Sequence, residues 1–237
     1  MQSEFLDKQG FNLQAVFDVA DLPEAIRSNL QSVAPGALDF RQLILLGNGG
    51  SRFWQALQDS PQAGSDPVDQ YSVDAVKAFF QETHPHTGYQ ILYPIDGSID
   101  QWQGRGFIGI QQIGDYAGWQ HSSPLKIGIN DTWGLWFAYR AVVVADTHLP
   151  PDSIERSLSP CAVCAPKTCI AACPVAAFTE HDYSIETCYA HRMSADSPCA
   201  YKCLARNSCP VQAGKRYTDE QIAYHYGRSL PLAPNTQ

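Results

Sequence analysis

The most informative part of this sequence reads CAVCAPKTCIAACPVAAF over 161–178, ETCYAHR over 186–192 and SPCAYKCLARNSCP over 197–210. All eight cysteines of the 237-residue protein lie in it. Two of them, Cys173 and Cys209, are followed directly by proline. Thiolates are soft ligands that suit zinc and iron–sulfur clusters. The sequence therefore predicts a metal-binding region between residues 161 and 210.

The spacing of the cysteines favours iron–sulfur clusters. Cys169, Cys173 and Pro174 follow the Cys-x3-Cys-Pro spacing that ends the bacterial ferredoxin run, in which the last cysteine ligates the other cluster of a pair. Eight ligands are the number that two four-iron clusters require. The pattern departs from ferredoxins in its longer gaps, with four residues after Cys164 and five after Cys203.

Disulfides and structural zinc are the alternatives to clusters. Disulfides suit secreted proteins, but the start MQSEFLDKQG lacks the basic and apolar segments of a signal peptide. Zinc could be bound by a four-thiolate site that opens with Cys161-x2-Cys164. The two Cys-Pro pairs and the apolar segment after Cys173 favour clusters over zinc. We expect a reducing compartment, most simply the cytoplasm.

Composition excludes two classes of partner. The formal net charge is −8 and no basic cluster is present, so we expect no nucleic-acid binding. No apolar run approaches the roughly 20 residues that span a membrane, so we expect no membrane insertion. The 44% hydrophobic content is ordinary for a globular core.

The rest of the chain predicts a sheet-and-helix domain. A short apolar run, Leu43 to Leu46, indicates a buried strand, and the following GNGG is read as a turn in preference to a phosphate loop, since it lacks the full glycine fingerprint. Helices are expected after Pro23, over 51–57 and over 72–83 with Ser72 as N-cap, and at 219–226 between Thr218 and Gly227. Strands are expected at 89–95, 105–114 and 134–146.

Arg140 lies inside the most apolar of these strands. A buried arginine needs a partner, because an unpaired buried charge is costly. The pattern leaves two possibilities open, an internal Asp or Glu, or a ligand carboxylate or phosphate held by the guanidinium fork.

Three stretches outside the cysteines resemble one family. DPVDQ (66–70), GLWFAYRAVVV (134–144) and RYTDEQIAYHYGRSL (216–230) are similar, in order and separation, to the cobalamin-processing proteins of the CblC (MMACHC) type. The resemblance implies a nitroreductase-like α+β domain that binds cobalamin. It also implies removal of the upper axial ligand of cobalamin, with reduced flavin for cyanide or glutathione for alkyl groups.

The same resemblance implies several ligand-binding residues. Arg140 matches an arginine that binds a glutathione carboxylate, and Trp136 and Phe137 match residues that line the cobalamin cavity. Tyr217 matches a pocket tyrosine. Arg228 matches a further glutathione-contacting arginine only if a short deletion precedes it. No catalytic residue is implied.

The cysteine region resembles a different group of proteins. It is similar to the two-cluster module of epoxyqueuosine reductase and of reductive dehalogenases, in which a lone cysteine between two cysteine-rich runs is a ligand, as Cys188 is placed here. The resemblance implies one four-iron cluster on Cys161, Cys164, Cys169 and Cys209. It implies a second on Cys173, Cys188, Cys199 and Cys203.

Together these features predict three regions and one leading function. Residues 1–156 are expected to bind cobalamin, 157–212 to bind the clusters, and 213–237 to form a helix that packs back on the first domain. The expected function is a cytoplasmic iron–sulfur oxidoreductase that removes the upper ligand of cobalamin with electrons from an external low-potential donor. The alternatives are a reductase that uses cobalamin as a permanent cofactor, and a non-catalytic cobalamin carrier with structural zinc.

Overall fold

The computed structural model describes residues 2–60, 66–95 and 106–230. These form two compact units. The first contains residues 1–118 and 137–156, and the second contains 119–136 and 157–237. Residues 119–136 and the C-terminal helix thus belong to the unit that carries the cysteines. The assignment of cobalamin and clusters to separate regions stays a prediction.

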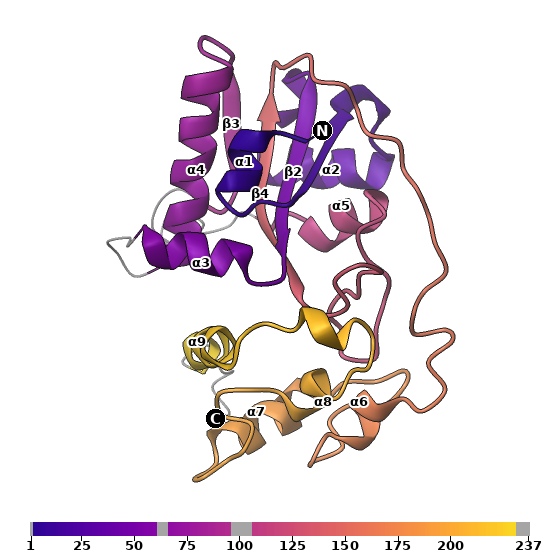
Figure 1. The fold of residues 1–237 in the computed structure, drawn as a ribbon. Helices are drawn as coiled ribbons and strands as arrows, with labels where there is room; N and C mark the ends of the chain where they lie inside the picture. Colours follow the sequence, from indigo (N-terminus) through magenta and orange to yellow (C-terminus); the bar gives the residue numbers. More distant parts are fainter. Residues whose placement is uncertain (1, 61–65, 96–105, 231–237) are drawn as a thin grey trace. The chain divides into compact units, whose positions relative to one another are not determined.

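An antiparallel sheet of four strands forms the core of the first unit, in the order β1-β2-β4-β3 (Figure 1). The strands are β1 (Leu13–Asp18), β2 (Gln42–Gly49), β3 (Tyr89–Tyr93) and β4 (Phe137–Ala145). Every residue of β2 is buried, as expected of an apolar central strand that is covered on both faces. The mixed helix-and-sheet class expected from the sequence is confirmed.

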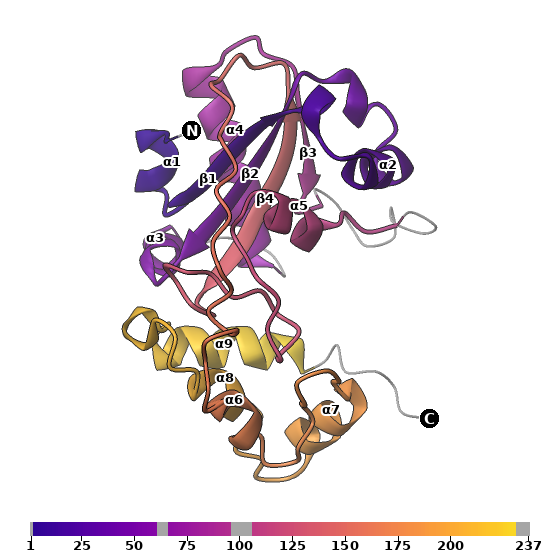
Figure 2. The same ribbon diagram turned by 90° about the vertical axis from the view of Figure 1, so that its right-hand side faces the viewer.

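Helices cover both faces of this sheet. They are α1 (Glu4–Lys8), α2 (Glu24–Val33), α3 (Arg52–Asp59), α4 (Pro67–Thr83) and α5 (Ile110–Tyr116), with short 3-10 turns at Val19–Asp21 and Ala37–Asp39. Both α4 and α5 contact β4, and they lie on opposite sides of it (Figure 2). The Asp66 side chain caps α4 and Pro67 occupies its first turn, where no backbone N–H is needed.

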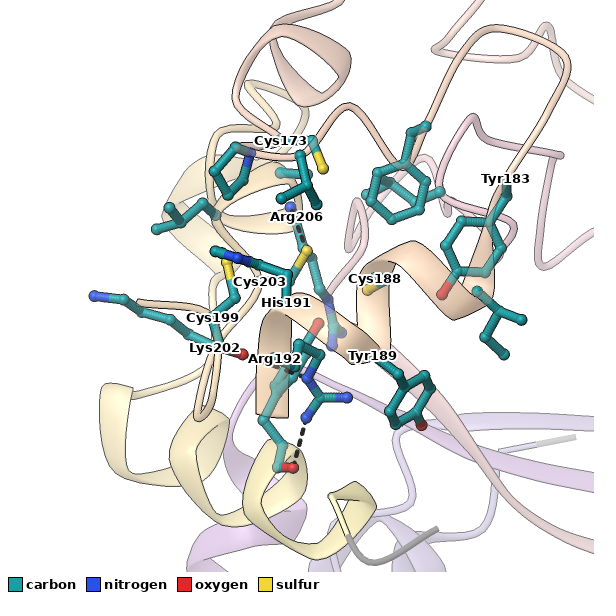
Figure 3. Close-up of a pocket in the computed structure, with 18 of the residues that line it drawn as sticks. Cys173, Tyr183, Cys188, Tyr189, His191, Arg192, Cys199, Lys202, Cys203 and Arg206 are labelled. Atoms are coloured by element: carbon teal, nitrogen blue, oxygen red, sulfur yellow. Dashed lines mark hydrogen bonds between the residues drawn. The ribbon is translucent and has the colours of Figure 1, made fainter. Parts of the chain in front are cut away.

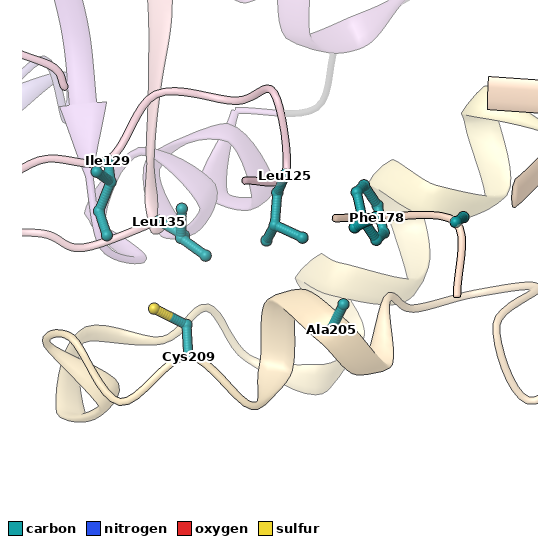
Figure 4. Packing of buried hydrophobic residues seen from close by; sticks show 7 residues of the cluster. Leu125, Ile129, Leu135, Phe178, Ala205 and Cys209 are labelled. Carbon is teal, nitrogen blue, oxygen red and sulfur yellow. The ribbon is translucent and has the colours of Figure 1, made fainter. Parts of the chain in front are cut away.

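The second unit has little regular structure. Its helices are α6 (Thr168–Ala171), α7 (Ile185–Met193), α8 (Leu204–Asn207) and α9 (Asp219–Ser229), with a 3-10 turn at Ala213–Lys215. An apolar cluster joins the 119–136 segment to the cysteine region (Figure 4). Its buried members are Leu125, Ile129, Leu135, Ala177, Phe178, Ala205 and Cys209.

Four local expectations from the sequence were wrong or incomplete. A strand was expected at 105–114, of which residue 105 lies outside the described residues: 106–109 have no regular structure, α5 begins at Ile110, and Ile113 is buried from a helical turn. Ser72 is not an N-cap, because α4 begins five residues earlier and the Ser72 hydroxyl donates to the Val68 carbonyl inside the helix. Gly227 does not end α9, which continues to Ser229. The mixed spacing of apolar residues near the N-terminus did not predict strand β1.

Other local expectations are confirmed. The strand at Leu43 to Leu46 lies within β2, and the helix after Pro23 is α2. The Thr218 hydroxyl caps α9 by accepting from the backbone N–H of Gln221 at 3.1 Å. Within the described residues, no helix is both long and apolar enough to cross a membrane.

Gly10 allows the turn before β1 to pack against α3. Its φ is +88°, and a Cβ there would lie 2.5 Å from the Phe53 Cα. We expect Gly10→Ala to destabilise the protein by about 1–3 kcal/mol, because backbone strain and overpacking add. Urea unfolding would measure the change. Gly214→Ala is the matched control, since a Cβ there meets nothing within 4 Å; equal effects of the two substitutions would contradict this interpretation.

Candidate functional site

The eight cysteines are placed by short helices and turns of the second unit. Cys161 and Cys164 lie in the turns before α6, Cys169 lies in α6, and Cys173 follows it. The other four lie in α7 (Cys188), in the turn before α8 (Cys199), at the N-cap of α8 (Cys203) and just after α8 (Cys209). All eight are free thiols, so the structure contains none of the disulfides considered as an alternative.

Electrostatic interactions reveal a first set of neighbouring thiols. Burial raises the pKa of the Cys161 thiol, Lys167 lowers it, and Cys209, Cys169 and Cys164 raise it further. Burial also raises the pKa of Cys209, which Cys169 and Cys164 influence in turn. These four thiols, Cys161, Cys164, Cys169 and Cys209, are therefore close enough to interact electrostatically.

A second set is formed by the remaining thiols. Burial raises the pKa of Cys188, and the nearby Cys173 and Cys199 add to the rise. Burial likewise raises the pKa of Cys203, with contributions from Cys188 and Cys199. The two sets have the same members as the two ligand groups implied by the resemblance to epoxyqueuosine reductase.

The second set lines an apolar cavity of about 210 Å³ (Figure 3). A water molecule takes about 30 Å³ in the liquid, so the cavity has room for a group much larger than one ion. Within the described residues, no three Cys, His, Asp or Glu side chains gather closely enough to ligate a single metal ion. A four-iron cluster binds each thiolate through a different iron and thus accepts wider spacing than zinc does.

Polar groups surround the second set. Backbone N–H groups donate to two of its sulfurs, from Ala177 to Cys173 at 3.3 Å and from Arg206 to Cys203 at 3.4 Å. Tyr183, Arg192, His191 and Arg206 also line the cavity. Such donors and cations stabilise negative charge on sulfur ligands. The spacing of the cysteines did not point to these residues, although three of them lie in the quoted cysteine motifs.

Arg140 lies at a β-bulge in the first unit. In the β2–β4 ladder Leu46 pairs with Ala141 and Gly47 with Tyr139, which leaves Arg140 without an opposite residue. Bulges re-aim side chains and are common beside active sites. The Arg140 Nε donates to the Asn48 Oδ1 at 2.6 Å, and the guanidinium lies 4.4 Å from the centre of the Phe53 ring.

No carboxylate of the described residues forms an ion pair with Arg140, although its side chain is only 8% exposed. The internal Asp or Glu considered as its partner is thus replaced by a neutral amide and an aromatic ring. Asn48 is itself held by a bond from its Nδ2 to the Gly50 carbonyl. The glycine turn therefore positions the arginine, a role that the motif GNGG did not suggest.

Tyr93 lies near the same guanidinium. Burial raises its pKa, Asp69 raises it further, and Arg140 lowers it. The arginine is thus the positive member of a polar group that also contains a half-buried phenol.

The other predicted ligand residues are divided between the units. In the second unit Trp136 and Tyr217 are both buried and meet edge to face, with ring centres 5.5 Å apart. The Arg206 guanidinium lies 4.5 Å from the centre of the Trp136 ring. In the first unit Phe137 begins β4 and packs edge to face on Tyr139 at 5.6 Å. Arg228 is exposed on α9, with its guanidinium 5.7 Å from the centre of the Tyr224 ring.

Comparisons with known proteins relate this chain to both groups that the sequence suggested. No family model matches the chain, and no curated protein matches it in sequence. Among solved structures, an epoxyqueuosine reductase with an epoxyqueuosine-modified tRNA-Tyr stem loop is similar, with a TM-score of 0.53 and 15% identity. The alignment covers 93% of this chain and 66% of that one. The enzyme from Bacillus subtilis matches with a TM-score of 0.53, 15% identity and coverages of 91% and 66%.

The B12-trafficking protein CblC of C. elegans, a homologue of human MMACHC, is also similar. Its TM-score is 0.52 at 14% identity, with 98% of this chain and 96% of that chain covered. This chain therefore spans slightly less than two-thirds of the epoxyqueuosine reductases but nearly all of CblC. The resemblance to both groups is confirmed in structure, and at these identities it shows the fold alone.

Proposed function

We propose that this protein is a cobalamin-binding iron–sulfur oxidoreductase that reductively removes the upper axial ligand of cobalamin. One observation carries the proposal: the eight thiols form two sets of four in one unit of a chain that matches CblC over nearly its whole length. The thiols suit redox clusters, and the fold suits cobalamin as the substrate. The nitroreductase-like label for the first unit belongs to this proposal.

The eight cysteine thiols are suitable ligands for two four-iron clusters. Cys161, Cys164, Cys169 and Cys209 would hold one, and the four thiols around the cavity would hold the other. When bound, such a cluster passes one electron at a time at low potential. The chain keeps six of the cysteines half-buried and two buried, and it supplies backbone N–H donors to two of the sulfurs. Burial of this kind limits access of water to the sulfurs and helps to set the potential.

Removal of cyanide from cobalamin requires one electron. The cobalt–cyanide bond breaks, cyanide leaves as an anion, and cobalt is reduced from the trivalent to the divalent state. An external low-potential electron donor supplies the electron. Removal of an alkyl group is different: a glutathione thiolate takes the alkyl group, and both bond electrons stay on cobalt.

Arg140 is the residue we assign to an anionic ligand, either the carboxylate of glutathione or a phosphate. Its Nε is occupied by Asn48, whereas no described residue bonds its two terminal nitrogens. Those nitrogens form the end of the fork that binds a carboxylate bidentately. Trp136, Phe137 and Tyr217 would supply apolar contacts to the corrin, and Arg228 a further contact to glutathione.

Metal analysis tests the cluster assignment. We expect anaerobically purified protein to contain about eight iron and eight sulfide per chain, because two four-iron clusters require them. Colorimetric iron and sulfide assays beside elemental analysis would measure this. Stoichiometric zinc with no iron would remove the redox function and leave a zinc-stabilised cobalamin carrier.

Turnover of cobalamin tests whether it is the substrate. Under anaerobic conditions, excess cyanocobalamin with a low-potential donor should lose its cyanide over many turnovers, followed by absorbance and by released cyanide. Donor without protein gives the background rate. If the protein binds one equivalent, retains it and processes no more, cobalamin is a permanent cofactor, as in a reductase that acts on another substrate.

Arg140→Lys tests the anion site. Lysine keeps the charge but cannot offer a planar fork, so we expect the KM for glutathione in dealkylation of methylcobalamin to rise about tenfold, which is about 1.4 kcal/mol. Thermal stability should change little. The matched control is Arg27→Lys, a substitution on the surface of α2. An unchanged KM in a destabilised Arg140→Lys protein would assign Arg140 a structural role only.

A further inference from the structure

We propose that Tyr183 raises the reduction potential of the second cluster site by donating a hydrogen bond from its hydroxyl to the Cys188 sulfur. The buried charge of Arg192 acts in the same direction. Both residues are thus tuning residues for electron transfer, and neither is a ligand. This inference rests on the proposed function, because it requires a cluster on the second thiol set.

The Tyr183 ring is fixed in place. It stacks on the Phe178 ring, with centres 4.7 Å apart and planes within 4° of parallel. The two residues also form an isolated antiparallel β-bridge, and the following Ser184 N–H donates to the Ala177 carbonyl at 2.9 Å. A ring held by this stack and by the backbone bridge can aim its hydroxyl at one acceptor with little loss of side-chain entropy.

The acceptor that we infer is the sulfur of Cys188, which lies one helical turn after the Ser184 cap of α7. Figure 3 shows the Tyr183 hydroxyl directed toward Cys188 across the cavity. A phenol hydroxyl aimed at a thiolate donates to it and stabilises its negative charge. Tyr183 thus favours negative charge on this sulfur.

Arg192 adds a positive charge that no carboxylate neutralises. Its side chain is 7% exposed, and its nitrogens donate to the carbonyls of Cys199, Ala200 and Tyr226 and to the Ser229 hydroxyl. All four acceptors are neutral. None of the described Asp or Glu residues forms an ion pair with it. A buried cation without a counter-ion is costly, and an anionic cluster in the adjoining cavity would offset that cost.

The effect on potential follows from charge. One-electron reduction would add one negative charge to a cluster held by the four cysteines that line the cavity. A hydrogen-bond donor to sulfur and a nearby buried cation both stabilise the more negative state, so they raise the potential.

The test compares the potentials of matched variants. Tyr183→Phe keeps the ring stacked on Phe178 and removes only the hydroxyl. In a dithionite titration followed by electron paramagnetic resonance, the reduction equilibrium of the second site should shift about tenfold toward the oxidised state. For one electron this is about 59 mV. The potential of the first site should stay unchanged.

Tyr189→Phe is the matched control. Tyr189 lines the same cavity, but its hydroxyl lies 3.5 Å from the Ser229 carbonyl, to which it donates. Its removal should leave both potentials unchanged.

A second experiment tests Arg192. Arg192→Lys keeps the positive charge and Arg192→Met removes it, so only the methionine variant should lower the potential of the second site.

Iron and sulfide assays on the same samples separate the two hypotheses. If wild-type protein contains no clusters, the proposed function fails and this inference fails with it. If all variants hold their clusters and the potentials of Tyr183→Phe and wild type agree, Tyr183 is not a tuning residue, while the proposed function stands. If Arg192→Met keeps its cluster at an unchanged potential, Arg192 has a structural role only.

Discussion

The packing of the 119–136 segment against the cysteine region is the interaction on which the candidate metal centre depends. The helices that carry the ligands are short, and α6 and α8 have four residues each. Helices of that length are unstable alone, so tertiary contacts must fix them. Leu125, Ile129 and Leu135 supply these contacts by packing on Phe178 and Ala205. Six of the eight cysteines belong to this cluster or pack against it, so the apolar core and the ligand sets are one structure.

Two buried arginines show a common arrangement. Arg140 and Arg192 are each bonded to neutral oxygen acceptors and lie over aromatic rings, and no described carboxylate pairs with either. Neutral acceptors satisfy the N–H groups but leave the charge uncompensated. A site of this kind favours an anion that arrives from outside the chain. For Arg140 that anion would be a substrate group, and for Arg192 a thiolate-ligated cluster.

The structural neighbours share one fold but differ in what they do. One is named for B12 trafficking and the others for reduction of epoxyqueuosine, and all match this chain at 15% identity or less. A common fold does not determine chemistry, which depends on the side chains placed at the site. Here those side chains are two sets of thiols in one unit and a bulged arginine in the other. The proposed function rests on these side chains together with the fold, and the fold alone does not show it.

The sequence by itself determined the features that depend on neighbouring residues. It located the buried strands β2 and β4, the Thr218 cap of α9 and the cysteine segment, because periodicity, capping and ligand spacing are local patterns. The partition of the thiols came from a resemblance, and spacing alone left it open. Ligand residues such as Trp136 and Tyr217 were likewise suggested only by similar proteins.

Tertiary structure decided what depends on contacts between distant segments. Of the two partners that the sequence left open for Arg140, only the fold removed the internal carboxylate; it placed Asn48, 92 residues earlier in the chain, beside the arginine and a bulge at that position. It made 110–116 a helix, because Ile113 is buried from a helical turn against the sheet. It also brought Tyr183 and Arg192 to the second thiol set. No local pattern encodes these pairings, because they result from the way the chain returns on itself to bury apolar surface.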